Sequence, residues 1–214
     1  MARHKIIDIG YDGLVSQENH ENIILHEDIL NILFKHKKEV YRHLIDLQGT
    51  FLIDHIAITI IDPSSQMIIF SISPSVEYNL IIQGLWKYDQ SYSVNFHKKN
   101  TFYIWEKAYS EKYFNDIKQI KEIKHGFTFG FNCAKKIDAF NLIYSYATRS
   151  KNNDLYEYYY NHMNELFGLG DYGYKLLQGI YAEYCNSSFE LPSIKYKQNC
   201  LAKHRLKLIV NNKR

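Results

Sequence analysis

Cysteine is scarce in this sequence, and the residues present form no recognisable site. The 214 residues include only Cys133, Cys185 and Cys200, an odd number with wide spacing and no CxxC pair. Neither a disulfide framework nor a zinc site is expected, and a reducing compartment is favoured. Motifs of the GxxxxGK, GxGxxG, HExxH and GxSxG types are absent, so the sequence does not support phosphate-loop, dinucleotide-binding, zinc-protease or hydrolase functions. We therefore expect no metal, no cofactor and no enzyme.

Long apolar runs are also missing. The first residues, Met1 to Asp8, lack the apolar stretch of a signal peptide, and no later segment has the length needed to span a bilayer. We therefore expect a cytoplasmic protein that does not enter a membrane. With 46% hydrophobic and 23% charged residues, a chain of this length can bury one large core without a metal or a disulfide.

The net positive charge comes from one end of the chain. We divide the sequence into an N-terminal arm (1–22), a main domain (23–190) and a basic C-terminal tail (191–214). The tail holds seven Lys and Arg residues and no acid, so subtracting its seven charges from the net charge of +3 leaves −4 on the rest. A solvated terminus, a helix docked on the protein or a second subunit, and non-specific contact with phosphate are all compatible with this composition.

Hydrophobic periodicity predicts the elements of the main domain. Helical spacing indicates a long amphipathic helix from Ile29 to Leu47 that stops at Gly49. Runs rich in Ile and Thr on either side of the turn at residues 62–65 predict an antiparallel hairpin. Later segments predict helices at 75–86, 106–124, 155–167 and 174–184, and strands at 101–105, 126–133 and 140–148. The glycine-dense stretch 168–173 is predicted to connect two helices.

This order of elements predicts an α/β sandwich, in which a central antiparallel sheet is flanked by helices on both sides. A sheet covered on both faces can hold a ligand between sheet and helices. The 19 tyrosines and 12 phenylalanines suit the wall of such a pocket, because tyrosine joins an apolar body to a hydroxyl. A coding bias toward Tyr, Asn, Lys and Ile would explain the same composition without any function.

With these elements placed, residues 51–150 resemble the autoinducer-binding domain of LuxR-type quorum-sensing regulators, which has a PAS/GAF-like fold. Residues 51–59 (Phe-Leu-Ile-Asp-His-Ile-Ala-Ile-Thr) are similar to the first strand of that family, and residues 73–78 to its "YPxxW" helix start. Residues 84–92 resemble the "YxxxDPV" segment, Trp105 occupies the place of a family tryptophan, and residues 124–129 resemble the "xxGxTxP" strand. The landmarks keep their order over about half of the chain.

The resemblance implies roles for particular residues. Asp89 matches the aspartate that accepts a hydrogen bond from the amide of an acyl-homoserine lactone. Trp105 matches the tryptophan beside the lactone ring, and Ser145 matches a hydroxyl residue near the amide. The main domain would then be a ligand-sensing domain, in which one carboxylate and one aromatic wall orient the ligand while aliphatic strands accept an acyl chain.

Two departures from the family pattern change the expected ligand. By the family's spacing from Asp89, the tryptophan that bonds the lactone carbonyl falls on Val76, and the tyrosine that bonds the acyl carbonyl falls on Leu80. Tyr78 or Trp86 could substitute if the helix is shifted. Otherwise each unpaired carbonyl costs about 1–3 kcal/mol, so the ligand need not be an acyl-homoserine lactone.

Family members continue into a helix-turn-helix domain that reads DNA, and the tail is too short for one. We therefore expect no sequence-specific DNA binding by the chain alone, and a role as a homo-oligomer or as a heterodimer with a full-length regulator. Two alternatives remain open: a structural or interaction protein with a filled pocket, and a GAF- or PAS-like enzyme with an unrecognised site. His55 with Asp54, or His125 with Asp89, could form an acid–base pair, but no nucleophile accompanies either.

Overall fold

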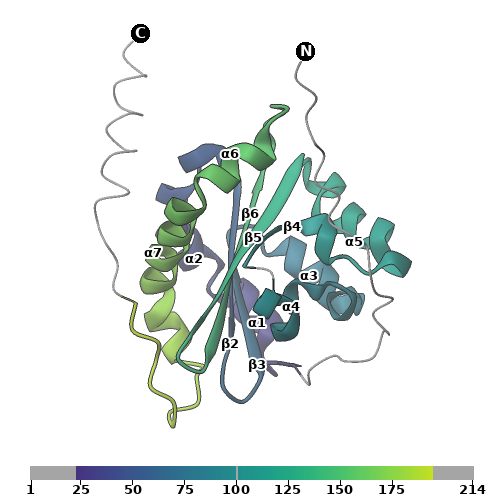
Figure 1. Ribbon diagram of the computed structural model, residues 1–214. Helices are drawn as coiled ribbons and strands as arrows, with labels where there is room; N and C mark the ends of the chain where they lie inside the picture. The colour runs from purple at the N-terminus through teal and green to yellow at the C-terminus, as the bar shows by residue number, and fades with distance from the viewer. Residues whose placement is uncertain (1–22, 100, 195–214) are drawn as a thin grey trace, which may run out of the picture.

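A computed structural model describes residues 23–99 and 101–194, so the expectations for the arm and for most of the tail lie outside the described residues. Its centre is a six-stranded sheet with the order β1-β3-β2-β6-β5-β4 (Figure 1). The strands are β1 (Ile24–Leu25), β2 (His55–Ile61), β3 (Gln66–Ser71), β4 (Phe102–Ile104), β5 (Phe129–Ile137) and β6 (Phe140–Thr148). Every pairing is antiparallel except that of the two-residue β1 with β3.

Helices cover both faces of the sheet, as the sequence predicted. On one face lie α2 (Lys37–Leu44), α6 (Leu155–Asn161) and α7 (Met163–Ala182), whose apolar residues join the largest buried cluster. On the other lie α3 (Ser75–Ile82), α4 (Val94–Lys99) and α5 (Phe114–Lys121), while α1 (Ile29–Lys35) packs against β3 (Figure 1). The predicted α/β sandwich with a central antiparallel sheet is confirmed.

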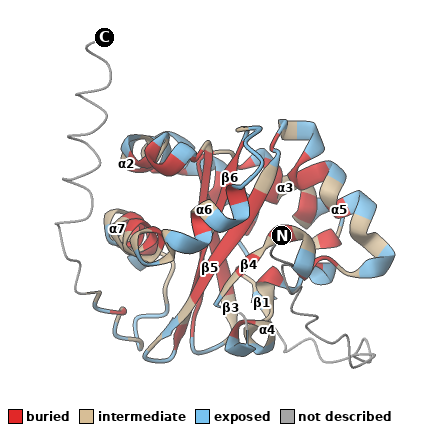
Figure 2. Cartoon of the chain, turned by 45° about the horizontal axis from the view of Figure 1, so that its top comes forward, coloured by how far each residue is buried: buried red, intermediate tan, exposed pale blue. Residues whose placement is uncertain are grey.

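The hairpin of β2 and β3 forms where turn chemistry predicted it. The Asp62 carboxylate accepts hydrogen bonds from the backbone N–H groups of Ser64 and Gln66 at 2.8 and 2.9 Å, which closes an Asx-type turn. All seven residues of β2 are buried, because the strand lies inside the sheet and helices cover both of its faces. Figure 2 shows the same burial along the strands and the inner sides of the helices.

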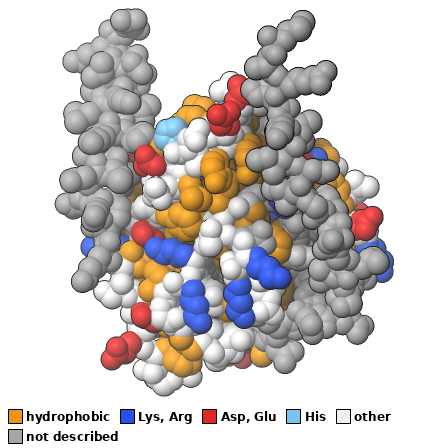
Figure 3. Space-filling view, in the orientation of Figure 1, with side chains coloured by type: hydrophobic (Ala, Val, Ile, Leu, Met, Phe, Trp, Pro, Cys, Tyr) orange, Lys and Arg blue, Asp and Glu red, His pale blue; other side chains and the backbone are white. Residues whose placement is uncertain are grey.

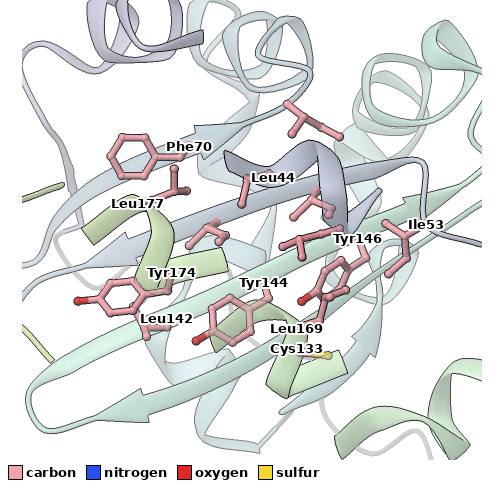
Figure 4. Packing of buried hydrophobic residues seen from close by; sticks show 14 of the residues in the cluster. Leu44, Ile53, Phe70, Cys133, Leu142, Tyr144, Tyr146, Leu169, Tyr174 and Leu177 are labelled. Atoms are coloured by element: carbon pink, nitrogen blue, oxygen red, sulfur yellow. The ribbon is translucent and has the colours of Figure 1, made fainter. Parts of the chain in front are cut away.

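The larger part of the core lies between the sheet and α7. Large side chains of the strands, among them Phe70, Tyr144 and Tyr146, interdigitate there with Leu44 and Leu177 (Figure 4). Two of the buried tyrosine hydroxyls donate hydrogen bonds: Tyr146 to the carbonyl oxygen of Leu166 at 2.9 Å, and Tyr144 to Oδ1 of Asp171 at 2.7 Å. Apolar side chains from the strands and from α2, α6 and α7 therefore fill this side of the sheet.

The predicted connection at residues 168–173 is wrong, because α7 runs through it without a break. A Cβ on Gly170 would lie 2.0 Å from Cδ2 of Tyr144, and one on Gly173 would lie 2.8 Å from Cδ1 of Ile58. These glycines are therefore not helix breakers. They let the helix approach the sheet closely. This need for glycine arises from tertiary packing and has no signal in the local sequence.

Two predicted long helices are also broken. The helix expected from Ile29 to Leu47 is divided between α1 and α2 at His36, whose φ of −93° and ψ of 5° leave the helical region. His36 Nε2 lies 2.7 Å from the hydroxyl of Tyr184, at the far end of the chain, which fixes the break in place. The charged helix expected at 106–124 is a series of 3₁₀ turns around α5.

Candidate functional site

The face of the sheet that α3, α4 and α5 cover has small side chains at its centre. Side chains alternate along a strand, so residues opposite each other on neighbouring strands share a face. Ala57 lies opposite Ser145, and Ser145 opposite Asn132. In the next row, Ala147 lies opposite Gly130. These small residues leave space that side chains from the covering segments enter.

Trp105 occupies the space above Gly130. A Cβ at Gly130 would lie 2.1 Å from Cε3 of the indole, so only glycine allows the ring to approach the strand this closely. The indole is 1% exposed, and its Nε1 donates a hydrogen bond of 2.9 Å to Oδ1 of Asn132. The residue that the sequence assigned to the aromatic wall is therefore fixed on this face.

Asn132 joins the surrounding polar side chains into one network. Its Oδ1 accepts from Trp105 and also from the Ser145 hydroxyl at 2.5 Å. Its Nδ2 donates to the hydroxyl oxygens of Ser91 and Tyr103 at 3.0 and 2.9 Å. Both acceptor positions and both donor hydrogens of the amide are used, so this buried group is fully satisfied.

The Asp89 carboxylate is buried and paired within the protein. Its Oδ1 accepts the backbone N–H of Ser91 at 2.9 Å, and its Oδ2 lies 2.7 Å from Nζ of Lys121. The ammonium group stands 4.3 Å from the ring centroid of Trp105 and 5.2 Å from that of Tyr109. The ion pair and the cation–π contacts together offset the desolvation of two buried charges. A ligand N–H would have to share this carboxylate with Lys121.

His97 closes the network at its outer end. Burial lowers the pKa of His97 to about 4, so the imidazole is neutral at pH 7. Nε2 lies 2.9 Å from the carbonyl oxygen of Ser91, and Nδ1 lies 3.4 Å from the Tyr103 hydroxyl. The tautomer that satisfies both contacts donates from Nε2 and accepts at Nδ1. Burial raises the pKa of Tyr103, so its hydroxyl keeps the proton that it donates.

The remaining predicted residues lie on or after α3. Val76 and Leu80 are 1% and 0% exposed and belong to the same apolar cluster as Trp105. Tyr78 is half-buried on another side of the helix and packs toward α1. Trp86 is half-buried and contacts both apolar clusters on this side of the sheet.

Of the seven predicted site residues, the structure thus joins three in one hydrogen-bonded network and places two beside it. Trp86 is half-buried against the apolar cluster that contains Trp105, whereas Tyr78 packs toward α1.

The histidine–aspartate pairs considered from the sequence are replaced by other partners. Nε2 of His55 lies 3.5 Å from Oε1 of Glu77. The Asp54 carboxylate accepts the backbone N–H of Arg149 at 2.6 Å, and Asp89 is paired with Lys121.

Two central residues, Lys121 and Asn132, were missed from the sequence. Lys121 follows Ile117 by four positions, so both lie on the inner side of α5, but a lysine in a charged segment reads as solvent-exposed. Asn132 interrupts an apolar strand between Phe131 and Cys133, and that interruption was the signal available. Burial of an amide within a strand predicts a hydrogen-bonded partner, although not which one.

The described part of the chain contains no group of three or more His, Cys, Asp or Glu side chains that could bind a metal ion. Among those same residues no helix has both the length and the apolar character to cross a membrane. A surface pocket of about 450 Å³ lies away from the network, between α1 and Tyr184; it is lined by Asp28, Leu30, Asn31, Phe34, Lys35 and Tyr184.

Comparison with known proteins gives structural neighbours only. No family model matches the chain, and no curated protein matches it. Among solved structures, it is similar to SdiA, a LuxR-type quorum-sensing receptor, in complex with octanoyl-rac-glycerol: the TM-score is 0.48 and the identity 12%, over 83% of this chain and 71% of that one. A structure of Escherichia coli SdiA gives a TM-score of 0.45 and 15% identity, over 83% and 73% of the two chains. At such identities no residue role passes from SdiA to this chain.

Proposed function

We propose that this protein is a LuxR-like sensor of a small acyl-type molecule, which binds between the sheet and α3 to α5 and modulates transcription or a partner regulator. The role is one of binding, not of catalysis. The observation that carries the proposal is the convergence of Asp89, Trp105 and Ser145 on one buried face. They come from three separate segments, and Asn132 and Lys121 connect them.

The chemistry of this face favours a ligand other than a standard acyl-homoserine lactone. Val76 and Leu80 offer no polar atom to the two ligand carbonyls, and each carbonyl left unpaired costs about 1–3 kcal/mol. Lys121 already donates to the carboxylate that would receive the lactone amide. A ligand of this protein therefore needs an apolar chain and a polar group placed elsewhere.

The test is to identify what the protein carries. Protein purified under native conditions is denatured, and the small molecules released are analysed by mass spectrometry. In parallel, thermal shift is measured against acyl-homoserine lactones, fatty acid esters and octanoylglycerol. We expect at least one acyl compound to raise the melting temperature. The proposal fails if none binds and nothing is released.

A second function, that of an interaction protein without a ligand, is favoured by a specific observation. The polar groups around Asn132 and Asp89 satisfy one another, as in a filled core. On α6, the exposed rings of Tyr156 and Tyr160 stack at a centroid distance of 6.0 Å, and hydrophobic side chains gather across the middle of the face in Figure 3. Such patches commonly mark protein interfaces. Under this function, no acyl compound changes the melting temperature.

The partners remain those expected from the sequence: a second copy of the chain, or a full-length regulator in a heterodimer. Specific readout of DNA needs side chains held against base edges by a rigid element in a groove. Mobility shifts with specific and scrambled promoters at physiological salt test whether the protein by itself distinguishes DNA sequences. We expect no discrimination by the protein alone, and discrimination only when a full-length regulator is added.

A further inference from the structure

A buried pair of ionisable residues lies beside the network and has atoms that the protein leaves unpaired. His55 begins β2 and Glu77 lies in the first turn of α3; they are 1% and 3% exposed. Nε2 of His55 is 3.5 Å from Oε1 of Glu77. Nδ1 of His55 and Oε2 of Glu77, at the other ends of the same groups, are buried without a hydrogen-bond partner.

Such atoms are rare in folded proteins, because an unpaired buried polar group loses its hydration and receives nothing in return. Here two occur in one contacting pair, and a third, Nε2 of His125, occurs nearby. The rings of His55 and His125 lie 5.4 and 5.8 Å from the ring of Phe127. Two apolar side chains would fill the same space without the cost of burying unpaired polar atoms. We therefore look for a binding role for these polar groups.

The pair belongs to the same layer as the candidate site. The His55 ring lies 6.1 Å from the Trp105 ring, edge to face, and His55 lies opposite Ala147 in the row that leads to Gly130.

We propose that His55 and Glu77 bind a hydroxyl group on the acyl-type ligand, an inference that rests on the proposed sensor function. The free oxygen of the Glu77 carboxylate requires a hydrogen-bond donor. When both ring nitrogens of His55 carry a proton, Nε2 faces Oε1 of Glu77 and Nδ1 can donate to an acceptor. A hydroxyl supplies both functions from one atom. A ketone, ester or lactone carbonyl only accepts, so it would leave Oε2 of Glu77 unpaired. The protein thus selects hydroxylated acyl compounds over their oxo and unsubstituted forms.

Three probes with the same chain length isolate this group: methyl 3-hydroxydecanoate, methyl 3-oxodecanoate and methyl decanoate. Calorimetry with the wild-type protein measures the affinity for each, and thermal shift checks the ranking. We expect the hydroxy ester to bind about tenfold or more tightly than the other two, because it alone pairs both buried atoms. Equal affinity for the hydroxy and oxo esters overturns the inference without any variant having to fold.

A matched pair of variants tests whether Glu77 causes the preference for a hydroxyl group. Glu77→Met removes the carboxylate but keeps an unbranched side chain, and Glu157→Met makes the same change at an exposed position of α6 on the opposite side of the sheet. We expect Glu77→Met to bind the hydroxy ester no better than methyl decanoate, and Glu157→Met to behave as the wild type. A hydroxyl preference that survives in Glu77→Met contradicts the assignment.

The two proposals fail in different ways. If methyl decanoate binds and the hydroxyl adds nothing, the hydroxyl site is wrong and the sensor function stands; the unpaired atoms then bind ordered water only. If none of the three esters binds, and no lactone or octanoylglycerol does, both proposals are wrong.

Discussion

The titration of His97 provides a direct test of the buried network. The imidazole is 7% exposed, and its neutral form accepts at Nδ1 from Tyr103 while it donates from Nε2 to the Ser91 carbonyl oxygen. Protonation would place a hydrogen on Nδ1 and so oppose the Tyr103 hydrogen bond. It would also place a positive charge in a layer where the Asp89 carboxylate is already paired with Lys121.

The direction and size of the effect follow from the two pKa values. Burial lowers the pKa of His97 from 6.5 to about 4 in the folded protein, so between these values the unfolded chain binds more protons. The stabilising contribution is complete above pH 6.5 and is lost as the pH falls from 6.5 to 4. The difference of roughly two and a half pH units corresponds to about 3 kcal/mol of unfolding free energy.

Urea unfolding of the wild type and His97→Gln across this range measures the contribution. Glutamine keeps an amide that can hydrogen-bond but does not titrate. We expect the wild-type free energy of unfolding to fall more steeply, by up to about 1.4 kcal/mol per pH unit. His43→Gln is the control, because that side chain on α2 is 38% exposed, and it should follow the wild-type curve. A constant difference between wild type and His97→Gln from pH 7.5 to 4.5 would refute the reasoning.

Three further predictions concern packing, charge and ligand. Gly170→Ala should lower the free energy of unfolding by about 1–3 kcal/mol, since the new Cβ meets the Tyr144 ring at 2.0 Å; the control Gly168→Ala, with nothing within 4 Å, should leave stability unchanged or raise it by up to about 1 kcal/mol in denaturant unfolding. Lys121→Met should lower the free energy of unfolding by about 3–5 kcal/mol, because it leaves the buried Asp89 carboxylate without its cation. Adding Asp89→Leu should recover part of that loss. If the double variant instead loses the sum of the two single losses, the ion pair does not contribute as proposed. Common acyl-homoserine lactones should bind weakly or not at all, and submicromolar affinity in calorimetry would show that Val76 and Leu80 do not limit binding.

Part of the candidate site could be located from the sequence through the family resemblance, while its role in binding a ligand stays a prediction. The resemblance marked Asp89, Trp105 and Ser145, and the structure places all three around one buried face. Their actual partners could not be predicted, since Lys121 is 32 residues from Asp89 and Asn132 is 27 residues from Trp105. A hydrogen-bond partner at such a separation is chosen by the fold and leaves no periodic signal in either segment.

The sequence by itself determined the hairpin of β2 and β3 and the sandwich architecture, because alternation, helical spacing and turn residues such as Asp62 act within a few positions of the chain. Tertiary structure decided where helices break and where they continue. The helix at residues 29–47 breaks at His36, which bonds Tyr184 from the other end of the chain. By contrast, α7 continues through Gly170 and Gly173, because their missing side chains let the helix approach Tyr144 and Ile58. Glycine is less favourable than alanine in a helix by about 1 kcal/mol per residue. The close packing of α7 against the sheet outweighs this cost.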